Sequence, residues 1–203
     1  MLVNGTGSRL AVLALAAAAL TACGKKDNAA ADSSAASSTA MGADTSASST
    51  KASNGTWTDA NIFALLDEAN MADSANGALA ATKGTAAAVR DYGKTMMRDH
   101  HTLRVQGAAL AKKLNVTPQA PSDDPLMPAA QQATNTLNST AKGKDFDKAY
   151  IDGEVDMHKK VLETATKAAD QTQTTELKNL IQKAAPTIQA HLAKAESIQK
   201  TLK

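Results

Sequence analysis

The spacing of apolar residues most strongly constrains the fold of this chain. In residues 87–114 they recur every three or four positions, which is the spacing of one face of an amphipathic helix. The same spacing returns in residues 58–83, from about residue 145, and from about residue 174. Alternating runs rich in Val, Ile and Thr, which indicate strands, are missing from the sequence. The pattern predicts an all-α fold.

Capping and breaking residues divide the pattern into separate helices. Thr58 is a good N-cap for a first helix that reaches Lys83. Four prolines between residues 118 and 128 prevent a long helix there, and a short helix is predicted over residues 128–137. Four long amphipathic helices, with a Pro-rich crossover and a short extra helix between the second and third, predict a four-helix bundle.

Each long predicted helix carries a histidine or an acid on its apolar face. These residues are Asp73, His100, Glu154 with His158, and His191. At about 1.5 Å per residue, Asp73 and His100 should differ by about 7 Å in height. Counted from a predicted turn near Thr172, Glu154 lies almost level with His191, and His158 lies one helical turn nearer to that turn. Burying such groups alone costs a few kcal/mol or more, so we expect them to converge or to be paired.

Two further residues adjoin this set. His101 lies well off the apolar face of its helix and is expected in solvent. Asp99 stands at the edge of that face and is expected to hydrogen-bond one of the histidines, as a supporting partner rather than a ligand.

The buried polar set has two interpretations. Histidine and carboxylate ligands suit a transition metal, namely Zn, Fe, Cu or Mn. Alternatively, these residues satisfy one another and buried water, in a structural or interaction module that serves envelope maintenance or stress tolerance. The ferritin-type Glu-x-x-His pair is missing, since Met97 and Val155 stand three residues before His100 and His158. With no nucleophile motif or phosphate loop either, the sequence favours a non-catalytic binding protein over an enzyme.

The N-terminal residues have the layout of a secretory signal. Arg9 precedes an apolar run, residues 10–19, that is too short to span a bilayer permanently. It is followed by Leu-Thr-Ala-Cys, which resembles the lipobox of bacterial lipoproteins and ends in Cys23, the one cysteine of the chain. We therefore predict a signal peptide over residues 1–22 and a membrane anchor of several acyl chains at Cys23.

The segment after Cys23 predicts a tether and a location. Residues 23–56 consist mainly of small and polar side chains, which is typical of a flexible spacer. Gly24, rather than Asp, follows the cysteine, as in lipoproteins sorted to the outer membrane, so the bundle is expected to face the periplasm. The net charge of +2 comes without a basic block, so nucleic-acid binding is not expected, and protein partners are not identified.

Several short motifs resemble the DUF4142 family of exported bacterial proteins over residues 57–203. They are Val89-Arg90-Asp91-Tyr92, Met96-Met97-Arg98-Asp99-His100, Phe146-Asp147-x2-Tyr150, Val155 to His158, and Pro186-x4-His191-Leu192. The resemblance implies a ferritin-like helical bundle, often assigned to the outer membrane, but no activity. The family's histidines match His100, His158 and His191, and its first-helix acid matches Asp73. Met157 stands where the family often has Asp.

Overall fold

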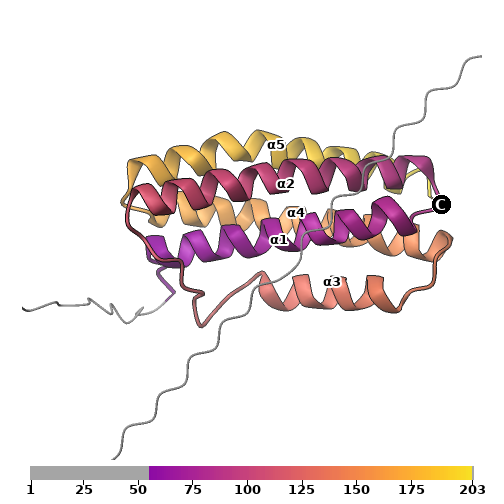
Figure 1. Cartoon of the computed structure of the whole chain (residues 1–203), viewed down its shortest axis with the longest axis horizontal. Helices are drawn as coiled ribbons and strands as arrows, with labels where there is room; N and C mark the ends of the chain where they lie inside the picture. Colours follow the sequence, from indigo (N-terminus) through magenta and orange to yellow (C-terminus); the bar gives the residue numbers. More distant parts are fainter. Residues whose placement is uncertain (1–54, 203) are drawn as a thin grey trace, which may run out of the picture. The chain divides into compact units, whose positions relative to one another are not determined.

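The computed structural model describes residues 55–202, and these are all-helical, without a strand. The helices are α1 (Asp59–Lys83), α2 (Ala87–Lys113), α3 (Met127–Ser139), α4 (Lys144–Gln171) and α5 (Thr175–Gln199) (Figure 1). The four long helices and the short extra helix confirm the predicted all-α bundle. The predicted signal peptide, Cys23 and nearly all of the predicted tether lie outside the described residues.

Capping explains where two of the helices begin. Thr58 is the N-cap of α1, and its side chain and that of Asn61 satisfy each other's backbone N–H groups in a capping box. The short α3 begins one residue earlier than predicted, at Met127. The Asp124 carboxylate accepts hydrogen bonds from the N–H groups of Leu126 (2.7 Å) and Met127 (3.0 Å) at that end.

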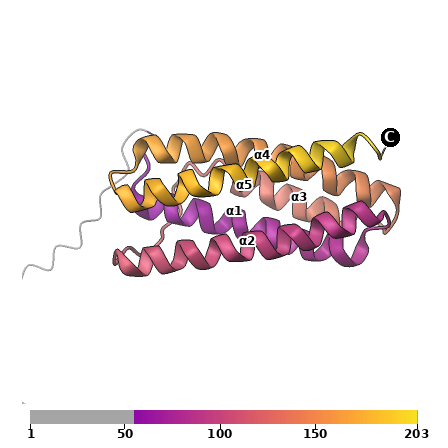
Figure 2. The same ribbon diagram turned by 90° about the horizontal axis from the view of Figure 1, so that it is seen from above.

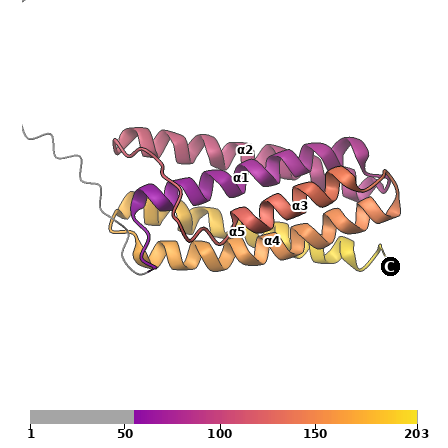
Figure 3. The same cartoon turned by 90° about the horizontal axis from the view of Figure 1, so that it is seen from below.

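The bundle is built from two antiparallel hairpins. The helices α1 and α2 form one hairpin, and α4 and α5 form the other (Figure 2). The connection from α2 to α4 runs back along the bundle, and within it α3 packs against α1 and α4 (Figure 3). This crossover makes the bundle ferritin-like rather than a simple up-down arrangement. No helix within residues 55–202 is long and apolar enough to cross a membrane.

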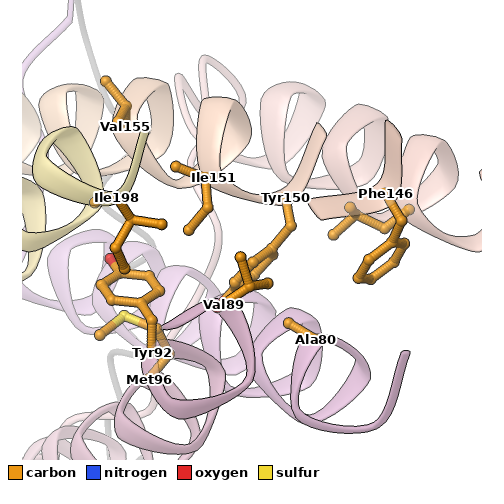
Figure 4. Close-up of a cluster of buried hydrophobic side chains, with 11 residues drawn as sticks. Ala80, Val89, Tyr92, Met96, Phe146, Tyr150, Ile151, Val155 and Ile198 are labelled. Carbon is orange, nitrogen blue, oxygen red and sulfur yellow. The ribbon is translucent and has the colours of Figure 1, made fainter. Parts of the chain in front are cut away.

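The apolar core is divided along the bundle into clusters. In one cluster, Tyr92 and Met96 of α2 lie opposite Tyr150 and Ile151 of α4 (Figure 4). A second cluster gathers around Trp57. His100 lies on α2 between Met96 of the first cluster and Ala111 of the second. The polar residues of the candidate site therefore interrupt the core rather than line its outer surface.

The two helices of the first hairpin touch through a pair of glycines. A Cβ atom added to Gly77 would lie 2.7 Å from the carbonyl oxygen of Gly93, and one added to Gly93 would lie 2.6 Å from that of Gly77. These neighbours are backbone atoms, which cannot rotate away. The absence of side chains at both positions is what allows α1 and α2 to approach this closely.

An aspartate of the second hairpin caps a helix of the first. The side chain of Asp147, in the first turn of α4, accepts hydrogen bonds from the backbone N–H groups of Thr85 (2.8 Å) and Ala86 (2.7 Å). The N-cap of α2 is Ala86, which has no capping side chain of its own. Asp147 therefore supplies from α4 the acceptor that the start of α2 needs.

We predict that Gly77→Ala destabilises the protein by about 1–3 kcal/mol, because the new methyl group would meet fixed backbone atoms of α2. Gly107→Ala is the matched control, since a Cβ there has nothing within 4 Å. Because alanine has a better helix propensity than glycine, Gly107→Ala should leave the stability unchanged or raise it by up to about 1 kcal/mol. Urea denaturation of both variants measures the difference. Equal stabilities would contradict the close glycine contact.

Candidate metal centre

The structure brings together the five residues that the sequence predicted to face the core. They are Asp73 from α1, His100 from α2, Glu154 and His158 from α4, and His191 from α5; none exceeds 5% exposure. The ring centroids lie 5.5 Å apart for His100 and His158, 5.2 Å for His100 and His191, and 5.6 Å for His158 and His191. One ring nitrogen from each histidine lies within 4.8 Å of the others. Three histidines from three helices thus surround one point.

Each of the three rings has one nitrogen bound to an oxygen acceptor. Nδ1 of His100 donates to Oδ1 of Asn70 at 2.8 Å, and Nδ1 of His158 donates to the backbone oxygen of Glu154 at 2.9 Å. Nε2 of His191 donates to Oδ2 of Asp99 at 3.1 Å. Because the acceptors carry no hydrogen, these bonds fix the tautomer of each ring.

The other nitrogen of each ring is left free. Within residues 55–202, Nε2 of His100, Nε2 of His158 and Nδ1 of His191 are buried without a hydrogen-bond partner. In a neutral ring each of these atoms carries a lone pair. Histidines that bind metals have this arrangement, in which one nitrogen is held by an oxygen and the other faces the ion.

Two carboxyl groups lie next to the rings of this histidine cluster. Oδ2 of Asp73 is 3.6 Å from Nδ1 of His100, and Oε2 of Glu154 is 3.5 Å from Nδ1 of His158. Both oxygens are buried and have no hydrogen-bond partner among the described residues. With His158 these two acids form a second group whose candidate ligand atoms lie within 4.8 Å of one another.

Burial keeps the histidines neutral. It lowers the pKa of His100 to about 3 and that of His158 to about 4, and neighbouring histidines add to both shifts. Burial also lowers the pKa of His191, although the Asp99 carboxylate opposes that shift. The hydrogen bond from Arg98 lowers the pKa of Asp99. Neutral imidazole is the form that binds a metal ion.

Burial has the opposite effect on the two buried acids. It raises the pKa of Asp73 to about 7. It raises the pKa of Glu154 well above the ordinary value, and the charge of Asp73 adds to this shift. Both carboxyl groups can therefore release protons if a cation arrives beside them.

The register of the helices differs from the sequence-based count in two places. Counted from the Gly77–Gly93 contact, Asp73 is four residues before and His100 seven residues after, so they differ by about 4–5 Å rather than 7 Å in height. Likewise His158, rather than Glu154, packs beside the ring of His191. The turn itself lies where the sequence predicted it, since α4 ends at Gln171 and α5 begins at Thr175.

Of the two side chains that hydrogen-bond to the histidine cluster, the sequence predicted one and not the other. Asp99 does bind a histidine, His191, as the geometry now shows. Asn70, which holds His100, was missed by sequence reasoning. The one feature of the sequence that could have identified Asn70 is its position three residues before Asp73. This spacing places both side chains on the same face of α1, toward α2. His101 is exposed, as expected for a residue off the apolar face.

The site is reached from two sides. A hollow of about 600 Å³ between α2 and α5 is lined by Asp99 and His191, together with Asp91 and Lys194. A cavity of about 300 Å³ reaches His100 and Asp73 from another direction. The histidine cluster is therefore buried but connected to the surface.

We predict that Asp73→Asn changes the pH dependence of stability. The pKa of Asp73 is raised from 3.8 to about 7 by folding. The protonated Asp73 side chain therefore contributes its full share of the unfolding free energy below about pH 4, and this share is lost as the pH rises to about 7. The asparagine variant stays neutral. Relative to wild type it should gain up to about 3 kcal/mol of unfolding free energy between pH 4.5 and pH 8, measured by urea denaturation in a chelator.

Asp156→Asn is the control for this pH dependence, because Asp156 is an exposed acid on α4. Its stability relative to wild type should hardly change with pH. If the difference between Asp73→Asn and wild type were the same at both pH values, the raised pKa of Asp73 would be wrong.

Comparison with known proteins supports the fold. A solved structure described as CopM in the Cu(II)-bound form is similar to this chain, with a TM-score of 0.60 and 13% sequence identity, over 73% of this chain and 99% of that chain. No curated protein matches the chain. The family model described as "Domain of unknown function (DUF4142)" matches residues 42–198, and the chain therefore belongs to the DUF4142 family.

Proposed function

We propose that this protein binds one transition-metal ion through His100, His158 and His191, with Cu(II) as the preferred ion. The observation that carries the proposal is the set of three buried ring nitrogens without partners, each on a ring whose other nitrogen is held by an oxygen. A buried polar atom without a hydrogen bond costs about 1–3 kcal/mol, and an ion would satisfy all three atoms at once.

The geometry requires a small contraction around the ion. Ligand nitrogens at about 2 Å from a tetrahedral metal lie about 3.3 Å from one another. One nitrogen of each ring lies within 4.8 Å of one nitrogen of each of the other two, so we expect modest rotations of the rings to close the site. Asp73 and Glu154 add two carboxyl groups within reach of the rings, which can balance the charge of the ion by releasing their protons.

The donor set favours copper among the candidate ions. Imidazole nitrogens suit copper, zinc and iron, and affinity for a given nitrogen site is highest for Cu(II) among the divalent first-row metals. The similar structure described as the Cu(II)-bound form of CopM makes copper the first ion to test.

The hollow between α2 and α5 offers a route to the site. Asp99 stands in its wall with its side chain 26% exposed, and it contacts both Arg98 and His191. A carboxylate there attracts a cation from solvent and holds the proton-bearing nitrogen of His191. Nothing in this route requires a reaction, so we propose a binding protein rather than an enzyme.

We predict that the full chain, reconstituted with Cu(II) and freed of excess ion, retains one equivalent by elemental analysis. His100→Ala and His191→Ala should each lower the affinity by at least about 10-fold, because one ligand is lost. Asn70→Ala should lower it by about 10–100-fold, because the His100 ring loses its support. Zn(II) is measured in parallel to test the preference for copper.

His101→Ala is the matched control, since it removes the exposed histidine next to His100. It should bind copper as wild type does. If wild type retained no stoichiometric metal, or if His101→Ala lost as much affinity as His100→Ala, the metal centre would be refuted. Histidine replacements that changed stability alone would favour the structural or interaction module.

We further propose that the protein is a lipoprotein of the bacterial envelope. The support comes from the sequence, in which the one cysteine, Cys23, ends a lipobox-like stretch after an apolar run. Residues 23–56 would then be the tether that links the lipid to the bundle, which would face the periplasm from the outer membrane. The ion would be bound outside the cytoplasm.

We predict that Cys23→Ser releases the protein from the membrane fraction of the expressing cell, because the acyl chains can no longer be attached. Ser33→Ala, in the tether, is the control and should stay with the membrane. Immunoblots of the separated fractions provide the measurement. Unchanged fractionation of Cys23→Ser would contradict the lipid anchor.

A further inference from the structure

A cavity of about 300 Å³ lies beside the histidine cluster, among α1, α2, α4 and α5. Its walls are mainly aliphatic, with Leu66, Leu103, Leu180 and Ile188 among them. Folded bundles pack at the density of organic crystals, so an apolar space of this size forfeits many contacts. It falls at the lower end of the size range of ligand pockets.

Small residues keep this cavity open. Gly107 and Ala108 of α2, and Ala184 and Ala185 of α5, line it where larger residues would fill it. A Cβ atom at Gly107 would have nothing within 4 Å. The small side chains at these positions therefore leave the space unfilled.

The inner end of the cavity holds a polar group without a partner. Asp73 lines the cavity, is 2% exposed, and has an Oδ2 atom without a hydrogen bond among the described residues. An apolar cavity that ends in one unpartnered carboxyl oxygen suits a ligand with an apolar body and one hydrogen-bonding head.

The charges around the cavity disfavour an anionic ligand, and its apolar walls disfavour a cationic one. Of its lining residues, Arg104 is the one cation, and its Nε and Nη2 atoms already bind the carboxylate of Asp67 at 2.8 Å and 3.2 Å. An anionic head would find no free cation and would face Asp73. A cationic head would have to leave water for an apolar space.

We propose that this cavity binds a small neutral molecule with an apolar ring or chain and a single hydroxyl group, and that the hydroxyl group hydrogen-bonds to the carboxyl group of Asp73. The aliphatic walls bury the apolar body, and the head satisfies the oxygen that is now unpartnered. His100, a proposed metal ligand, also lines the cavity, but the partner of the hydroxyl group is Asp73, and binding does not require a bound metal.

Equilibrium dialysis of the full chain against 2-naphthol, in the presence of a chelator, tests this proposal. Wild type should bind one equivalent saturably, and 2-naphthoate, which has the same rings with a carboxylate, should bind at least 10-fold more weakly. Asp73→Ala should weaken the binding of 2-naphthol several-fold while leaving the binding of naphthalene unchanged. The chelator keeps this test independent of the metal centre, so either proposal can fail alone.

Filling the cavity provides the second arm of the test. Gly107→Phe on α2 and Ala184→Phe on α5 should each reduce 2-naphthol binding at least 10-fold, because both positions line the cavity. Ala109→Phe is the control, because Ala109 is an exposed residue of α2 that does not line the cavity. Circular dichroism checks that each variant is folded. Absence of saturable binding to wild type, equal binding of 2-naphthoate, or full binding by both folded filling variants would overturn the proposal.

Discussion

The close contact of Gly77 and Gly93 determines where the side chains of the first hairpin meet. It allows the backbones of α1 and α2 to touch and thereby fixes which residues of the two helices face each other. Asn70 then lies opposite His100, near enough for a 2.8 Å hydrogen bond, and Asp73 lies beside them. A wider spacing would lengthen these contacts and leave the His100 ring without a fixed orientation.

The polar cluster is costly for a bundle of this size. Three histidines and two acids occupy positions that apolar side chains could fill, and burial drives all five toward their neutral forms. Hydrogen bonds satisfy only part of their polar atoms, so the remaining atoms lower the stability of the folded state. Such a set is more readily explained by a ligand than by packing, since packing alone would favour aliphatic residues.

Much of this arrangement could be predicted from the sequence. Periodicity and capping residues identified the helices, and the apolar face of each helix contained the five residues that converge. The register of the first hairpin could not be predicted, because it depends on the Gly77–Gly93 contact, which helical periodicity does not encode. Asn70 was missed for the same reason, since only the register places it against His100. The cavity depends on small residues of two helices that are distant in sequence.

The cap that Asp147 places on α2 connects the two hairpins at one end of the bundle. His100 belongs to the first hairpin, whereas His158 and His191 belong to the second. An ion held by all three rings would tie the halves together more firmly at the level where Asp99 of α2 already binds His191 of α5. The metal would then be a removable cross-link added to the shared apolar core and the polar contacts between the halves, and the resistance of the bundle to opening would depend in part on the supply of the ion.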